Sequence, residues 1–126
     1  MKKNKVPELT SKDEKIINIF SDLGMPKNLA KTLMCISQCQ ECRSADIEYG
    51  ARLRQPEVSV AMHNLEERGW ISKRDEKKEG KGRPIYIYKL NYPIDDIIET
   101  FEKQKMKEIE SVKKDIKELK ELINNR

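Results

Sequence analysis

The sequence lacks the features that mark membrane proteins, secreted proteins and large enzymes. No stretch approaches the roughly 20 consecutive apolar residues of a membrane span, and the start, MKKNKVPEL, has no apolar run like that of a signal peptide. Only 37% of the 126 residues are apolar, which predicts a small core without a large catalytic cavity. We therefore expect one compact cytoplasmic domain, with at most a helical appendage and no membrane partner.

Signatures of catalysis are missing as well. The chain has a single histidine, His63, and no GxSxG-type turn, so a nucleophile and its base cannot be paired. It also has no glycine-rich phosphate loop. We predict that the protein is not an enzyme and carries no cofactor.

Cysteine is scarce, and its count is odd. Cys35, Cys39 and Cys42 predict free thiols rather than a disulfide framework. Their C-x3-C-x2-C spacing is that of the iron–sulfur triad of radical S-adenosylmethionine enzymes, but the chain is too short for the barrel of such an enzyme. On a helix Cys35 and Cys39 would share a face, so a thiol or metal sensor is an alternative. The preferred interpretation is ordinary packing with no bound metal.

Charge, by contrast, is abundant and unevenly distributed. Charged residues make up 38% of the chain, and 26 basic residues exceed 22 acidic ones. From Ile94 onward there are 8 basic and 9 acidic residues, which leaves 18 basic and 13 acidic residues before it. The whole positive excess therefore lies in the first three quarters of the chain, where a polyanionic partner would bind.

Apolar residues at helical spacing predict four helices in that part of the chain. The expected ranges are residues 9–23, 26–40, 44–53 and 56–69. Thr10 or Ser11 is the expected cap of the first helix, Ser44 caps the third, and Pro56 suits the first turn of the fourth. The third helix should turn Ala45, Ile47, Ala51 and Leu53 inward, and the fourth should bury Val58, Ala61, Met62 and Leu65.

Two strand candidates follow, Trp70–Lys73 and Ile85–Leu90. The segment that joins them, KRDEKKEGKGR, contains Gly80 and Gly82 and has six basic residues against three acidic ones. This composition predicts a charged hairpin with a flexible tip.

A long helix is predicted from Pro93 to about Asn124. Its apolar residues step by 3, 4, 3 and 4 from position 109 to 123, the spacing of a coiled-coil seam, with an interruption of the register around 102–106 where we expect a stutter, bend or change of partner. A narrow seam in a charged helix favours pairing with a second copy, although the helix could instead fold back on the first helix of its own chain. The predicted dimerisation residues are Ile98, Phe101, Ile109, Val112, Ile116, Leu119 and Ile123.

This order of elements is that of a winged helix-turn-helix. The run RLRQPEVSVAMHNLEERGWISKRDEKKEGKGRPIYIYKL resembles the recognition helix and wing of prokaryotic regulators of the MarR and TrmB groups, over about residues 44–90. We predict a mainly α fold with a small β-hairpin wing. A winged helix-turn-helix DNA-binding domain would cover residues 9–92, and a C-terminal dimerisation helix residues 93–126.

The resemblance implies a transcriptional regulator that binds double-stranded DNA as a homodimer and represses by blocking a promoter. The fourth helix would enter the major groove, while arginines beside it fix its position on phosphates. Glu57 would repel phosphates unless it accepts from a cytosine amino group, so it could instead be a helix-start charge. The predicted contacts of this part are Ser44, Arg52, Arg54, Gln55, Glu57, Ser59, Val60, His63 and Asn64.

The basic wing would lie on the adjacent backbone or minor groove. Its predicted contacts are Lys73, Arg74, Lys77, Lys78, Lys81 and Arg83, although charge runs are often only solvated loops. Two other functions are compatible with the fold: a protein-interaction module of a transcription assembly and an architectural nucleoid protein. A polar outward face over residues 55–64 favours DNA, whereas a contiguous apolar patch there would favour a protein partner.

Overall fold

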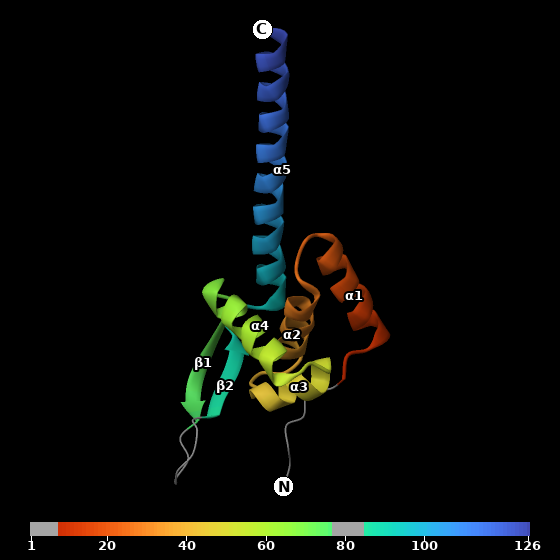
Figure 1. The fold of residues 1–126 in the computed structure, drawn as a ribbon. Helices are drawn as coiled ribbons and strands as arrows, with labels where there is room; N and C mark the ends of the chain where they lie inside the picture. The colour runs from red at the N-terminus through yellow and green to blue at the C-terminus, as the bar shows by residue number, and fades with distance from the viewer. Residues whose placement is uncertain (1–7, 77–84) are drawn as a thin grey trace. The chain divides into compact units, whose positions relative to one another are not determined.

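The computed structural model describes residues 8–76 and 85–126. These divide into two compact units, one up to Pro93 and one from Ile94 onward. In chain order the elements are α1 (Ser11–Asp22), α2 (Lys27–Ser37), α3 (Ser44–Ala51), α4 (Gln55–Glu67), β1 (Ile71–Glu76), β2 (Ile85–Leu90) and α5 (Ile94–Asn124), shown in Figure 1. The predicted fold class, mainly α with a two-stranded hairpin and a long C-terminal helix, is confirmed.

Helix α1 begins with a reciprocal cap. The Asp13 N–H donates to Thr10 Oγ1 at 3.2 Å, and the Thr10 N–H donates to Asp13 Oδ2 at 2.9 Å. The cap is therefore Thr10 rather than Ser11, the other predicted candidate. This exchange satisfies two backbone donors that a helix start otherwise leaves without partners.

Helix α2 is the centre of the first unit and packs against α1, α3, α4 and β2. Leu33, Cys35 and Ile36 are fully buried within it. The helix ends at Ser37, three residues before the predicted end, because the N–H groups of Gln38 and Cys39 bond to carbonyls three residues back and tighten the last turn. Cys39 therefore lies beyond the helix, and the prediction that it shares a helical face with Cys35 is wrong.

Helices α3 and α4 form the helix-turn-helix. Ser44 is the first residue of α3 and not its cap, which is Arg43, whose N–H donates to Asp46 Oδ2 at 2.9 Å. Arg52 ends α3 in the left-handed conformation, at φ 57°. Ala45 is exposed rather than turned inward as predicted. The predicted buried face of α4 is confirmed: Val58, Ala61, Met62 and Leu65 are all buried.

The hairpin is antiparallel, with Ile71 opposite Leu90 and Glu76 opposite Ile85. Strand β1 therefore continues three residues past Lys73, into the segment that we predicted as the hairpin tip. The pairing with β2 supplies backbone partners to these polar residues, which carry no strand signal of their own. Gly69, at φ 79°, makes the turn from α4 into β1.

Helix α5 is 31 residues long and continuous. The helix runs without a break through residues 102–106, where we expected a stutter, bend or change of partner. Ile97 and Phe101 are buried, whereas Ile98 and the seam residues from Ile109 to Ile123 are exposed. Within residues 8–76 and 85–126, none of the helices combines the length and apolar character of a membrane span.

Candidate nucleic-acid interface

The outward face of α4 carries polar side chains over a buried apolar face. Gln55, Ser59 and His63 are exposed on it, and Val60, the one large apolar residue among them, is 70% exposed. The His63 imidazole lies 3.3 Å from the Glu67 carboxylate, one turn further along. Hydrogen-bonding groups and a single methyl-bearing side chain are what a helix needs to read base edges in a major groove.

Two predicted DNA contacts on this face, Asn64 and Glu57, instead accept hydrogen bonds within the protein. Asn64 is half-buried, and its Oδ1 accepts from Arg68 Nε at 2.9 Å. Glu57 is also half-buried, and its Oε1 accepts from the Arg54 backbone N–H at 2.8 Å. Glu57 thus caps α4, as the alternative interpretation of this residue expected, and its negative charge lies at the positive end of the helix dipole.

Arg54 is the most prominent cation beside α4. Its side chain is 85% exposed, and its guanidinium lies 3.9 Å from Glu57, which is a loose, solvent-screened ion pair. Arg54 is the N-cap residue of α4, so its side chain extends from the start of this helix. An exposed guanidinium at this place can pair with a phosphate oxygen.

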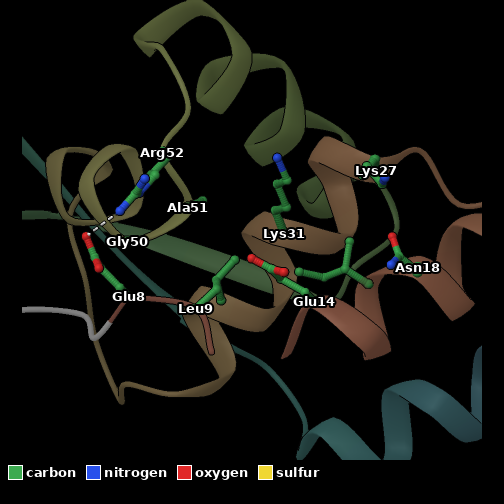
Figure 2. A pocket seen from close by; sticks show the side chains of 10 residues that line it. Glu8, Leu9, Glu14, Asn18, Lys27, Lys31, Gly50, Ala51 and Arg52 are labelled. Atoms are coloured by element: carbon green, nitrogen blue, oxygen red, sulfur yellow. Dashed lines mark hydrogen bonds and ion pairs between the residues drawn. The ribbon is translucent and has the colours of Figure 1, made fainter. Parts of the chain in front are cut away.

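Arg52, the other predicted arginine, borders a hollow of about 480 Å³ between α1, α2 and the end of α3. Figure 2 shows its guanidinium pairing with Glu8, at 3.3 Å. Lys27, Lys31 and Glu14 line the same hollow, so both signs of charge are present. The exposed side chain of Arg52 is therefore shared between solvent and this acidic partner.

The described base of the wing carries two of the predicted cations, and both have acidic partners. Lys73 lies 3.8 Å from Glu66 and 4.5 Å from the centre of the Tyr86 ring. Arg74 donates to Glu41 Oε1 at 2.7 Å. The remaining predicted wing contacts, Lys77, Lys78, Lys81 and Arg83, lie outside the described residues.

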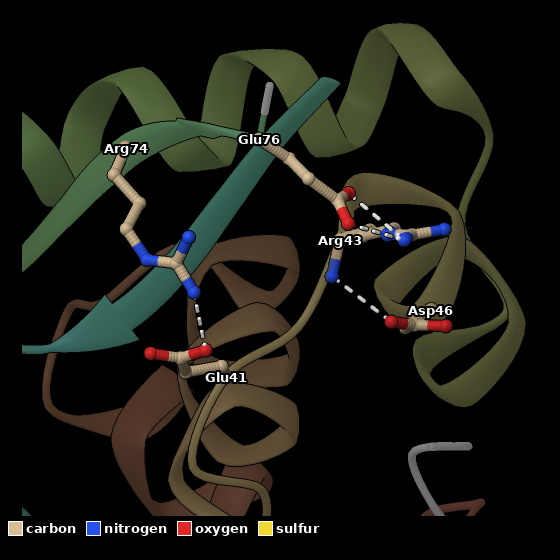
Figure 3. Close-up of polar contacts among 5 residues, drawn as sticks. All are labelled: Glu41, Arg43, Asp46, Arg74 and Glu76. Carbon is tan, nitrogen blue, oxygen red and sulfur yellow. Dashed lines mark hydrogen bonds and ion pairs between the residues drawn. The ribbon is translucent and has the colours of Figure 1, made fainter. Parts of the chain in front are cut away.

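Two ion pairs that the sequence did not predict join the wing to the segment between α2 and α3. Glu41 holds Arg74, and Arg43 holds Glu76 at 2.8 Å, as Figure 3 shows. Each pair spans 33 positions of sequence. Only the tertiary fold brings these residues together, because no local pattern marks such a partnership. We call Glu41, Arg43, Arg74 and Glu76 the wing bracket.

The cysteines differ strongly in environment. Burial, with a smaller contribution from Cys39, raises the pKa of the Cys35 thiol to about 12. The Cys39 and Cys42 thiols share a hydrogen bond, which lowers the pKa of Cys39 and, together with burial, raises that of Cys42. Among the described residues, no cluster of three or more His, Cys, Asp and Glu side chains has the arrangement of a metal site.

Comparisons with known proteins support the fold. No family model matches the chain, and no curated protein matches its sequence. The chain is similar to the structure of TrmBL2, an archaeal chromatin protein, at 15% identity and a TM-score of 0.56, over 87% of this chain. The chain has the winged helix-turn-helix fold. The predicted resemblance to winged-helix regulators is thus confirmed at the level of the fold.

The matched region is only 41% of the TrmBL2 chain. Two further similarities are to MepR of S. aureus, solved as a DNA complex, and to NMB1585, a MarR family regulator from Neisseria meningitidis. For MepR the identity is 18% and the TM-score 0.49, over 91% of this chain and 93% of that one. For NMB1585 the values are 16% and 0.47, over 91% and 90%. The fold follows from the likeness to TrmBL2.

Proposed function

We propose that the protein is a cytoplasmic transcription regulator that binds double-stranded DNA as a homodimer and has no enzymatic activity. Helix α4 would enter the major groove, and the wing would lie on the adjacent backbone or minor groove. The similar structure TrmBL2 is an archaeal chromatin protein that binds DNA, which fits this assignment.

The observation that carries the proposal is the two-sided character of α4. Its inner face is fully packed, so the helix is held firmly on the fold. Its outer face offers Gln55, Ser59, Val60 and His63, and Arg54 extends into solvent at its start. Val60 alone does not make an apolar patch, so this face favours DNA over a docked protein. Arg54 would hold one phosphate.

The acidic partners of the wing cations Lys73 and Arg74 weaken the DNA binding expected from the wing. Lys73 and Arg74 would have to exchange Glu66 and Glu41 for a phosphate, which reduces the net gain from each contact. The same holds for Arg52, which is paired with Glu8. We therefore assign most of the phosphate binding in the described residues to Arg54, whose ion pair with Glu57 is loose. Few phosphate contacts per chain give weak binding at cellular salt, so two chains on two half-sites are needed.

Helix α5 supplies a surface for that second copy. The side chains of the seam, Ile109, Val112, Ile116, Leu119 and Ile123, are 45–57% exposed in one chain. They repeat at coiled-coil spacing on a helix whose other positions are mostly charged. Ile98 is also exposed, but Phe101 is buried within one chain. The proposed pairing surface therefore extends from Ile109 to Ile123.

The test is binding of the purified, reduced protein to the duplex upstream of its own gene and to a scrambled duplex of equal length, over a salt series. The proposal predicts tighter binding to the native duplex and an affinity that falls linearly with salt on logarithmic axes. Equal binding to both duplexes would indicate an architectural role instead. No binding to either duplex would refute the DNA-binding proposal and favour a protein-interaction module.

A further inference from the structure

The segment between α2 and α3 contains a pair of thiols at C-x-x-C spacing, Cys39 and Cys42. The chain bends at residues 39–41, between the two cysteines, and each thiol is the largest influence on the pKa of the other. Cys35 is excluded from this pair because it is fully buried within α2. The C-x-x-C arrangement is typical of thiols that interconvert with a disulfide.

The two thiols differ in access to solvent. Cys39 lies half-buried after the end of α2, whereas Cys42 is only 2% exposed. The hydrogen bond from Cys42 lowers the pKa of Cys39, against the opposing effects of burial and of Asp46. Cys39 is thus the thiol that a small oxidant reaches first and that ionises more readily, and Cys42 is placed to resolve the oxidised product.

We propose that Cys39 and Cys42 form a reversible disulfide on exposure to a peroxide, and that this disulfide weakens DNA binding. The Cys39 thiolate attacks one peroxide oxygen, which breaks the O–O bond and gives a sulfenic acid and hydroxide. The Cys42 sulfur then attacks the Cys39 sulfur, forming the S–S bond and releasing water. Overall, two thiols lose two electrons and two protons, and hydrogen peroxide becomes two waters.

The position of Cys42 couples this chemistry to the wing. Its N–H donates to the Tyr88 carbonyl at 3.0 Å, and the Tyr88 N–H donates back to the Cys42 carbonyl at 2.8 Å, so Cys42 is bridged directly to β2. Its neighbours on either side, Glu41 and Arg43, belong to the wing bracket that holds β1 (Figure 3). Arg43 also caps α3.

A disulfide would rotate the buried Cys42 side chain toward Cys39 and away from the Tyr88 carbonyl, from which its sulfur lies 4.0 Å in the reduced protein. The backbone on both sides of Cys42 must adjust, and the two ion pairs of the wing bracket and the cap of α3 lie there. The wing and the helix-turn-helix would then lose the relative placement that binding requires. This regulatory part of the inference rests on the proposed DNA-binding function.

The experiment treats the full-length protein with hydrogen peroxide, then measures free thiols and DNA affinity before and after reduction with dithiothreitol. We expect the number of free thiols to fall from three to one, with no cross-linked dimer on a non-reducing gel. All three cysteines lie between Lys31 and Arg43, so one tryptic peptide holds them and fragmentation must locate the bond. DNA affinity should fall about tenfold, a change of about 1.4 kcal/mol, and dithiothreitol should restore it.

Two variants provide the controls. Cys39→Ser, at a half-buried position, should keep the DNA affinity of the reduced protein and lose the response to peroxide. Cys35→Ala, which leaves the pair intact, should respond as the natural chain does. Cys42→Ser is the less informative change, because its hydroxyl would be buried.

The possible outcomes separate the two proposals. Three free thiols after peroxide, a bond that includes Cys35, or a bond between chains would each overturn the Cys39–Cys42 disulfide. A Cys39–Cys42 bond that leaves DNA affinity unchanged would overturn its regulatory role. A reduced protein that binds no DNA would refute the proposed function and with it the regulatory role, while the thiol count would still decide whether the disulfide forms.

Discussion

Ile116, near the middle of the α5 seam, offers a quantitative test of dimerisation. Replacing it with alanine removes three carbon atoms from a side chain that is 49% exposed in one chain. Burying three carbon groups completely is worth about 2.4 kcal/mol, at about 0.8 kcal/mol each. If a partner helix covers only the exposed half, the substitution loses about 1.2 kcal/mol per chain, or about 2.4 kcal/mol per dimer. The dimer dissociation constant should therefore rise about 50-fold.

Sedimentation equilibrium over a range of protein concentrations measures this constant directly. Lys114→Ala is the matched control, because it truncates a long side chain on the opposite face of the same helix. Alanine favours helix at both positions, so loss of α5 itself would not explain a difference between them. A natural chain that stays monomeric at high concentration, or equal dissociation constants for Ile116→Ala and Lys114→Ala, would refute pairing through the seam.

Three further predictions concern the first unit. Arg54→Ala should weaken DNA binding and reduce the slope of log affinity against log salt by about one, as measured by fluorescence anisotropy; Lys15→Ala, which removes an exposed cation of α1, should leave the slope unchanged. Asp13→Asn should destabilise the protein at pH 7 by about 0.5–1 kcal/mol in urea unfolding, because the first turn of α1 loses a negative charge. The hydrogen bond from Thr10 holds the pKa of Asp13 below its usual value of 3.8, so the advantage over asparagine should disappear as the pH falls through that lowered pKa; a difference independent of pH would contradict this account. Gly69→Ala, at φ 79° with nothing within 4 Å of the added carbon, should cost about 1 kcal/mol from backbone strain alone, and unchanged stability in the same assay would show that the turn tolerates a side chain.

The elements that the sequence predicts well are those with local signals. The buried face of α4 follows from the spacing of Val58, Ala61, Met62 and Leu65, and α5 follows from its unbroken run of helix-forming residues. Thr10 and Asp13 have the spacing of a capping box. In each case, the residues that determine the structure lie within one or two helical turns of one another.

The errors occur where distant residues decide the structure. The length of β1 depends on pairing with β2. The end of α2 is an exception, because it is a local tightening of the last turn that leaves Cys39 outside the helix. The candidate interface shows the same division. The outward side chains of α4 could be predicted from periodicity, but the partners of Arg52, Lys73 and Arg74 could not, because each belongs to another segment of the chain.

Guanine methylation protection on the best-binding duplex tests whether α4 reads the major groove from each half of a dimer. Dimethyl sulfate modifies guanine N7, which lies in the major groove. We predict two protected clusters related by two-fold symmetry, both lost in an α4-face variant such as Ser59→Glu. Protection of a single cluster would contradict the dimer, and bound DNA without N7 protection would contradict the placement of α4.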